Sequence, residues 1–122
     1  MIRSLSCGRQ LLIHRSEVAP RCTVLNPLIT VGLPPDLRAS AGIDTFSHAV
    51  EALHSTMREP VTDSIAVESI RLISQNLETA LTSDSDPETR TNMHTAASTA
   101  GITASNAFFG IVHALAHALD SI

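Results

Sequence analysis

Two pairs of residues of metal-ligand type stand four positions apart in this chain. Asp44 and His48 form the first pair, and His113 and His117 form the second. Residues four apart lie on one face of an α-helix, one turn from each other. A carboxylate and imidazole nitrogens from different helices of a bundle can converge on one divalent cation. Such ligands suit Fe(II), Zn(II), Mn(II) or Co(II), and the residue types do not choose among them.

Each of these residues also has an ordinary structural interpretation. A single histidine on an apolar helical face is usually a core residue with its N–H satisfied, and an aspartate near a helix start usually caps the helix. Glu51, three residues after His48, is either a group that orients that histidine or an ordinary charged residue. We expect His14, His54 and His94, which have no partner at ligand spacing, to be surface or packing residues.

The composition favours one folded domain of packed helices. Of the 122 residues, 43% are hydrophobic and 16% are charged, as in globular proteins. Only 2% are aromatic, so the core must come from Ala, Leu, Ile and Val. The scarcity of aromatic side chains and the net charge of −4 argue against a nucleic-acid partner. No apolar run is long enough to span a bilayer, so we expect no membrane partner.

The N-terminal stretch differs in character from the rest. Residues 1–22 hold four arginines and a single acid, which is typical either of a mitochondrial transit peptide or of two short strands. We favour strands within 11–14 and 21–25, and an ordered, proline-containing connector over 26–36. Cys7 and Cys22 fit no disulfide framework, which indicates a reducing compartment. A cytoplasmic location is therefore expected, with a mitochondrial one as the alternative.

Helical periodicity begins after this lead-in. It predicts helices over 43–56, 61–81, 88–107 and 110–122, with Pro60 at the end of the first helix or the start of the second, and Pro87 at the first position of the third. Phe108 and Phe109 separate the last two helices. The apolar residues at helical spacing in the first two helices are Ile43, Phe46, Val50, Leu53, Ile65, Val67, Ile70, Leu72, Ile73 and Leu77. The predicted fold class is mainly α: a bundle of three to four main helices behind a short strand-and-loop lead-in.

Several motifs occur in a defined order along the chain. They are GIDTFSHAVEALHS, EPVTDSIAVESIRLISQNL and AGITASNAFFGIVHALAHAL, preceded by TVLNPLITVGLPPDLRASAGID. Together, from about residue 20 to residue 119, they resemble the helical C-terminal domain of the iron-containing (group III) alcohol dehydrogenases, which has the dehydroquinate synthase-like fold. The resemblance implies that residues 1–35 are the end of a dinucleotide-binding domain and that residues 36–122 are an incomplete helical metal-binding domain.

The resemblance also implies roles for the ligand-type residues. In this family one aspartate and three histidines hold a divalent metal, usually iron and sometimes zinc, and motif matching assigns Asp44, His48 and His113 to three of these positions. His117 matches a histidine near the nicotinamide and the substrate that assists proton transfer, and is the expected catalytic residue. The metal then acts as a Lewis acid while hydride passes between a small alcohol or aldehyde and NAD or NADP. The family resemblance is also compatible with a homo-oligomer.

Two features of the family are missing from these 122 residues. The third metal histidine belongs to a later histidine-glycine segment, and Asp120 stands where a glycine usually follows the paired histidines. The Gly-rich phosphate loop of the dinucleotide-binding domain is also missing, so no residue here is assigned to cofactor binding. We therefore expect a fragment of an NAD(P)-linked alcohol dehydrogenase, truncated at both ends and inactive as an isolated chain.

Two alternatives remain. In the first alternative, the chain is a non-catalytic helical interaction module, or a remnant that pairs with a full-length homologue through exposed apolar faces. In the second alternative, it is a relative with the same architecture and with glycerol dehydrogenase or maleylacetate reductase activity. The HALAH run favours the alcohol dehydrogenase branch over the latter.

Overall fold

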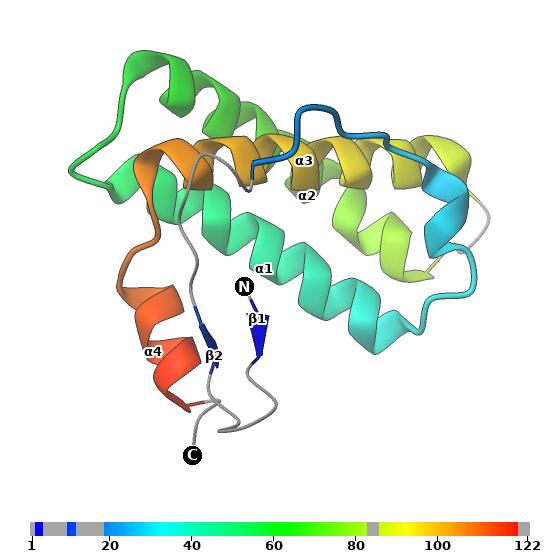
Figure 1. Cartoon of the computed structure of the whole chain (residues 1–122). Coiled ribbons are helices and arrows are strands. Elements are labelled where there is room, and N and C mark those ends of the chain that lie inside the picture. The colour runs from blue at the N-terminus through cyan, green and yellow to red at the C-terminus, as the bar shows by residue number, and fades with distance from the viewer. Residues whose placement is uncertain (1, 4–9, 12–18, 83–85, 120–122) are drawn as a thin grey trace.

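A computed structural model describes residues 2–3, 10–11, 19–82 and 86–119 of this chain (Figure 1). Its helices are α1 (Pro35–His54), α2 (Pro60–Thr82), α3 (Pro87–Ala107) and α4 (Ile111–Leu119), and a 3-10 helix, η2 (Pro27–Thr30), precedes them. Strands β1 (Ile2–Arg3) and β2 (Gln10–Leu11) pair in an antiparallel ladder, with Ile2 opposite Leu11. The predicted mainly α fold class is confirmed.

Three of the helices form the body of the domain. α1, α2 and α3 each pack against the other two, and η2 packs against α3. α4 leaves the end of α3 at an angle of 101° and lies beside the body rather than within it (Figure 1). Phe108 makes this change of direction with a φ of 63°, in the left-handed region that non-glycine residues rarely adopt.

Small side chains form the core of the three-helix body. Ala49, Ala66 and Ala100 are fully buried and pack together, one from each helix. A second cluster joins Ala96 to Leu72 and Ile73. Short side chains allow the helix backbones to approach closely, which explains how a domain with so few aromatic residues closes its core.

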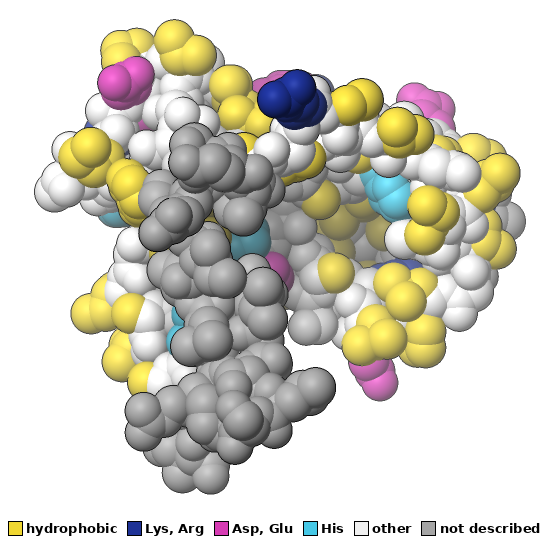
Figure 2. Space-filling model, in the orientation of Figure 1, with side chains coloured by type: hydrophobic (Ala, Val, Ile, Leu, Met, Phe, Trp, Pro, Cys, Tyr) yellow, Lys and Arg dark blue, Asp and Glu magenta, His cyan; other side chains and the backbone are white. Residues whose placement is uncertain are grey.

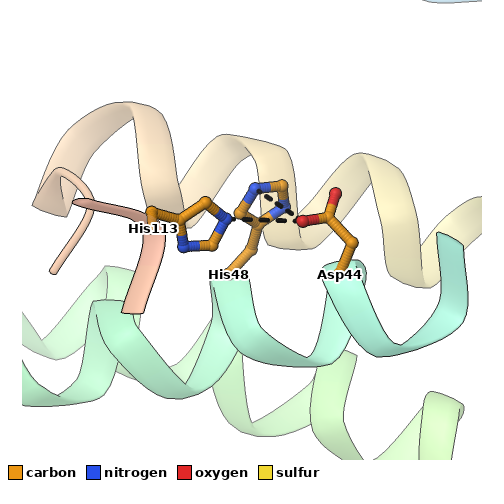
Figure 3. Close-up of side chains that lie close together, drawn as sticks. All are labelled: Asp44, His48 and His113. Atoms are coloured by element: carbon orange, nitrogen blue, oxygen red, sulfur yellow. Dashed lines mark ion pairs between the residues drawn. The ribbon is translucent and has the colours of Figure 1, made fainter. Parts of the chain in front are cut away.

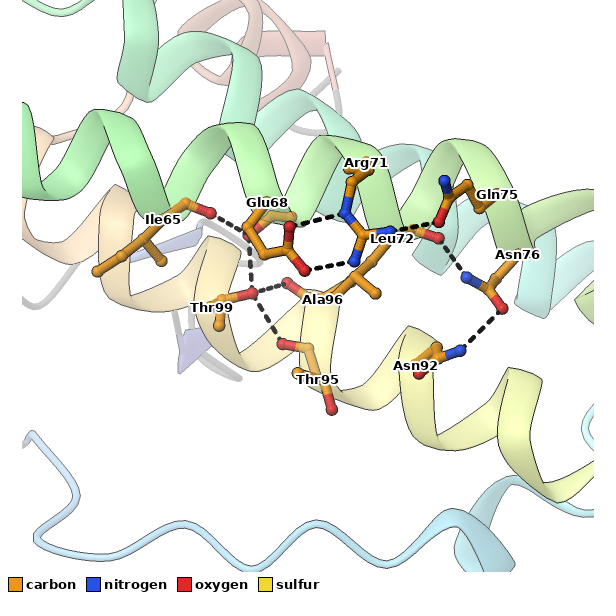
Figure 4. Close-up of polar contacts among 11 residues, drawn as sticks. Ile65, Glu68, Arg71, Leu72, Gln75, Asn76, Asn92, Thr95, Ala96 and Thr99 are labelled. Carbon is orange, nitrogen blue, oxygen red and sulfur yellow. Dashed lines mark hydrogen bonds and ion pairs between the residues drawn. The ribbon is translucent and has the colours of Figure 1, made fainter.

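Polar contacts between α2 and α3 accompany this close packing (Figure 4). The buried Ser69 hydroxyl donates to Thr99 Oγ1 at 2.7 Å, and the Asn92 side-chain amide donates to Asn76 Oδ1 at 3.1 Å. Each contact joins a side chain of α2 directly to one of α3. The two contacts therefore help to set the register of α2 against α3.

The apolar faces predicted for α1 and α2 are only partly buried, which corrects the expectation from the sequence. Ile43, Phe46 and Val67 are 58%, 37% and 58% exposed. α1 turns a face of smaller residues inward instead, and Gly42, Thr45, Ala49 and Ala52 are its buried members. Both faces have helical spacing, so periodicity alone could not decide between them. The face of small residues is the buried one because it lets α2 and α3 approach α1 closely.

The helix starts also differ in part from expectation. α1 begins at Pro35, eight residues before the predicted position 43, because proline suits the first turn and Asp36 favours the positive end of the helix dipole. Pro60 starts α2, and Pro87 follows the N-cap residue Asp86 as predicted. α4 spans Ile111–Leu119, and residues 120–122 of the predicted helix lie outside the described part.

Of the two strands predicted near the N-terminus, one does not form and one is described only in part. The strand predicted over residues 21–25 is wrong, since these residues are exposed and adopt no regular structure. The other predicted strand overlaps the structure at Leu11 in β2, and its remaining residues lie outside the described part. The domain boundary at residue 35 stays a prediction.

No single helix in the described ranges is long and apolar enough to cross a membrane. The bent pair of α3 and α4 passes the same test when its two helices are taken together, by length and composition only.

Substitution of Ala96 by leucine tests the small-residue core. Ala96 is fully buried, so a larger side chain must displace its neighbours and should destabilise the fold by about 1–3 kcal/mol. Ala97, the next residue on α3, is exposed, and Ala97→Leu should change stability by less than about 0.5 kcal/mol. Urea denaturation of both variants measures the difference, and equal stabilities would contradict this account of the core.

Asp86 offers a test at the start of α3. Its side chain accepts hydrogen bonds from the Thr89 hydroxyl and from the Glu88 and Thr89 backbone N–H groups, and these contacts lower the pKa of its carboxyl. A lowered pKa means that the stabilisation is complete above the unfolded-state pKa, about 3.9, and is lost as the pH falls through the folded-state pKa. Asp86→Ala should lower the melting temperature at neutral pH. Asp86→Asn should retain most of the cap without its pH dependence.

Candidate metal centre

Three of the ligand-type residues converge where α4 meets α1. Asp44 and His48 project from successive turns of α1, and His113 of α4 lies beside them (Figure 3). One ligand atom from each residue lies within 4.8 Å of the other two. Asp44 Oδ1 is 3.4 Å from His113 Nε2 and 3.9 Å from His48 Nε2. The spacing of Asp44 and His48 in the sequence already predicts that they share one helix face. Their proximity to His113 depends on the position of α4.

The surroundings of His113 fit a bound cation. Its Nε2 atom is buried and has no hydrogen-bond partner, although such atoms normally have one. The other ring nitrogen, Nδ1, lies 2.5 Å from Glu51 Oε2, while Nε2 lies near Asp44 and His48. A carboxylate oxygen and two imidazole nitrogens form a donor set that suits a divalent transition metal.

Burial controls the protonation of His48. Desolvation lowers the pKa of this imidazole, and nearby His113 acts in the same direction against the opposing effects of Asp44 and Glu51. A lowered pKa extends the neutral form to more acidic pH. Neutral imidazole is the form that binds metals.

Glu51 contacts the centre in a way that the sequence did not reveal. The sequence suggested His48 as its partner, but the structure places its carboxylate on His113. Burial raises the pKa of Glu51, but hydrogen bonds from the Gly110 N–H, the His113 ring and the Val112 N–H outweigh it, and the net shift is downward. The carboxylate therefore stays charged inside the protein.

Phe109 is a second feature that sequence reasoning did not place at the site. Its ring lies 4.6 Å from the His113 ring and 5.0 Å from the His48 ring, centroid to centroid. The His48 and His113 rings stack with centroids 4.5 Å apart. The three rings thus form one cluster, and the only sequence signal was the interruption of the helical pattern by Phe108 and Phe109.

His117 lies next to the three-residue group but is not part of it. Its ring is 6.0 Å from the His113 ring, and its Nε2 atom is buried without a hydrogen-bond partner. Its catalytic role stays a prediction. Of the other histidines, His54 is exposed and bonds to the Val50 carbonyl, while His94 contacts the Thr30 hydroxyl. His14 lies outside the described residues.

The comparisons with known proteins agree with the geometry. Residues 38–121 match the family model described as "Fe-containing alcohol dehydrogenase family, C-terminal". The chain is 42% identical over 103 residues to 1,3-propanediol dehydrogenase of Citrobacter freundii, a match that covers 84% of this chain and 27% of that protein. The family resemblance carried by the motifs is confirmed, and the chain spans about a quarter of the length of the relatives that it matches.

Solved structures give the same result. An iron-containing alcohol dehydrogenase from Thermococcus thioreducens is 31% identical and superposes with a TM-score of 0.80, over 84% of this chain and 27% of that one. A sulfoacetaldehyde reductase from Bifidobacterium kashiwanohense, solved in complex with NAD+, is 30% identical with a TM-score of 0.76, over 80% of this chain and 26% of that one.

Replacement of Phe109 by leucine tests the ring cluster. The Phe109 ring stacks on the His113 ring and shields protons above its face, so the His113 ring protons should move downfield in Phe109→Leu. Phe46→Leu is the matched control, because Phe46 lies on α1 two residues from Asp44 and two from His48 but is partly exposed. Proton NMR of the histidine rings measures the effect, and identical spectra for the two variants would refute the stacking.

Proposed function

This chain belongs to the iron-containing alcohol dehydrogenase family, and from that premise we propose that it supplies metal ligands to an NAD(P)-linked alcohol dehydrogenase. The observation that supports the proposal most is the convergence of Asp44, His48 and His113. The Nε2 atom of His113 in this group is buried and has no hydrogen-bond partner. The proposed substrates are small alcohols and aldehydes, the compound class on which the family acts.

Asp44, His48 and His113 would hold the divalent metal, with iron(II) as the first choice and zinc(II) as the second. When bound, such an ion supplies Lewis-acid polarisation of an alcohol or carbonyl oxygen, and NAD or NADP supplies or accepts the hydride. NAD+ is present in the similar sulfoacetaldehyde reductase structure, which supports this choice of cofactor.

The remaining groups shape access to the site and the movement of protons. The Asp44 side chain is 61% exposed, so the site is open to solvent and to substrate on that side. Phe109 covers the histidine rings and limits the approach of water from its own side. His117 lies next to His113 and would accept the substrate hydroxyl proton and pass it to solvent.

A role in binding another protein is the second candidate, and one observation favours it. Large apolar side chains remain exposed on α4 and on the outer face of the body, and Figure 2 shows hydrophobic side chains at many points of one face. The exposed members on α4 are Ile111, Val112, Leu115 and Leu119. Surfaces of this kind usually meet other protein. Homo-oligomerisation belongs to the same candidate.

Metal titration tests the ligand assignment. The 122-residue protein should bind one divalent ion, and Asp44→Ala and His113→Ala should each weaken that affinity by more than about a hundredfold, because each removes a ligand atom. Anaerobic titration with Co(II), followed through its visible absorption, measures the affinity.

Two further variants serve as controls in the same titration. His117→Ala should retain binding, because His117 is not one of the three converging residues. His54→Ala, at an exposed position of α1, should also bind as the wild type does. Unchanged affinity in both Asp44→Ala and His113→Ala would exclude the assignment.

A further inference from the structure

We propose that Glu51 is the positioning residue of the metal centre, because its carboxylate holds both the ring of His113 and the start of the helix that carries this ring. The inference rests on the proposed function, since it concerns the same group of ligands.

Four groups of one helix start converge on this carboxylate. Its Oε2 atom accepts the Gly110 N–H at 3.0 Å and lies 2.5 Å from His113 Nδ1. Its Oε1 atom accepts the Val112 N–H at 2.6 Å and the His113 N–H at 3.3 Å. Glu51 is only 7% exposed. A negative charge at this position also meets the positive end of the α4 dipole.

The contact with the ring determines which nitrogen is free to bind. A carboxylate offers only hydrogen-bond acceptors, so the His113 Nδ1 atom facing it carries the hydrogen. The lone pair then belongs to Nε2, the atom that lies 3.4 Å from Asp44 Oδ1. Histidine ligands of metals commonly have such a carboxylate partner on the opposite nitrogen, which fixes the tautomer and the ring orientation.

Glu51 contacts both the His113 ring and the start of α4 because it replaces the usual N-cap side chain of α4. Helix starts are usually capped by the side chain of the residue just before the helix, but that residue is Gly110, which has no side chain. The acceptor comes instead from α1, 59 residues earlier. A Cβ atom on Gly110 would lie 3.1 Å from Glu51 Oε1, so the glycine leaves room for the carboxylate. One carboxylate therefore ties α4 and its histidine to the helix that carries Asp44 and His48.

Replacement of Glu51 by glutamine gives the first measurement. Glutamine has almost the same size, but its NH2 group turns donors toward the N–H groups of α4 and its oxygen carries no charge. Co(II) affinity of Glu51→Gln should fall about 10–100-fold. Glu78→Gln, at an exposed position of α2, is the matched control and should bind as the wild type does.

A second variant keeps the negative charge but shortens the reach of the carboxylate. Glu51→Asp keeps the charge near the start of α4 but draws the carboxylate back from His113 by one methylene. Circular dichroism should show wild-type helix content in this variant, while its Co(II) affinity falls about tenfold or more. If Glu51→Asp is folded and binds Co(II) as the wild type does, the positioning role is overturned.

NMR of the histidine nitrogens provides a readout that a purely structural role would not move. In the Zn(II)-loaded wild type, long-range proton–nitrogen spectra should show a hydrogen on His113 Nδ1 and metal on Nε2. In Glu51→Gln this assignment should become mixed or reversed. An unchanged His113 pattern together with unchanged affinity overturns the inference alone. Failure of the wild type to bind any divalent ion overturns the proposed function, and the inference with it.

Discussion

The candidate site depends on one buried carboxylate at the start of a helix. α4 exposes most of its large apolar side chains, so little hydrophobic burial holds it in place. Glu51 compensates by accepting three backbone N–H groups and contacting the ring of His113. The buried charge is tolerated because every contact donates to it. This interaction holds His113 of α4 close to Asp44 and His48 of α1.

The three-helix body supplies the rigid side of the site. Its alanine-rich core brings α1, α2 and α3 close together and keeps Asp44, His48 and Glu51 on one well-supported helix. The same packing turns residues such as Ile43 and Phe46 outward. Close packing of small residues thus orders Asp44 and His48 and, at the same time, leaves large apolar side chains exposed. The chain matches about a quarter of the length of its relatives, and such a surface is compatible with their greater size.

The fold identifies the family, and the donor atoms at the candidate site suit the kind of metal that the family's name gives. The helices superpose on an iron-containing alcohol dehydrogenase, and the converging oxygen and nitrogen atoms suit a divalent transition metal. Fold alone would not assign a function, because one architecture serves several reactions. The geometry of the candidate site adds the chemical content: burial lowers the pKa of His48, and the buried Nε2 atom of His113 has no hydrogen-bond partner.

The sequence by itself determined the features that depend on local spacing: the helices, the proline at the start of α3 and the placement of Asp44 and His48 on one face. These follow from the helical period and from residues close along the chain. Only the tertiary structure decided which face of α1 is buried, that Glu51 serves His113 and that Phe109 joins the rings. It also showed that the strand expected over 21–25 does not form. These features depend on the packing between helices and on the turn at Phe108, where residues about 60 positions apart meet. No local pattern encodes such contacts, because they arise only when the whole bundle closes.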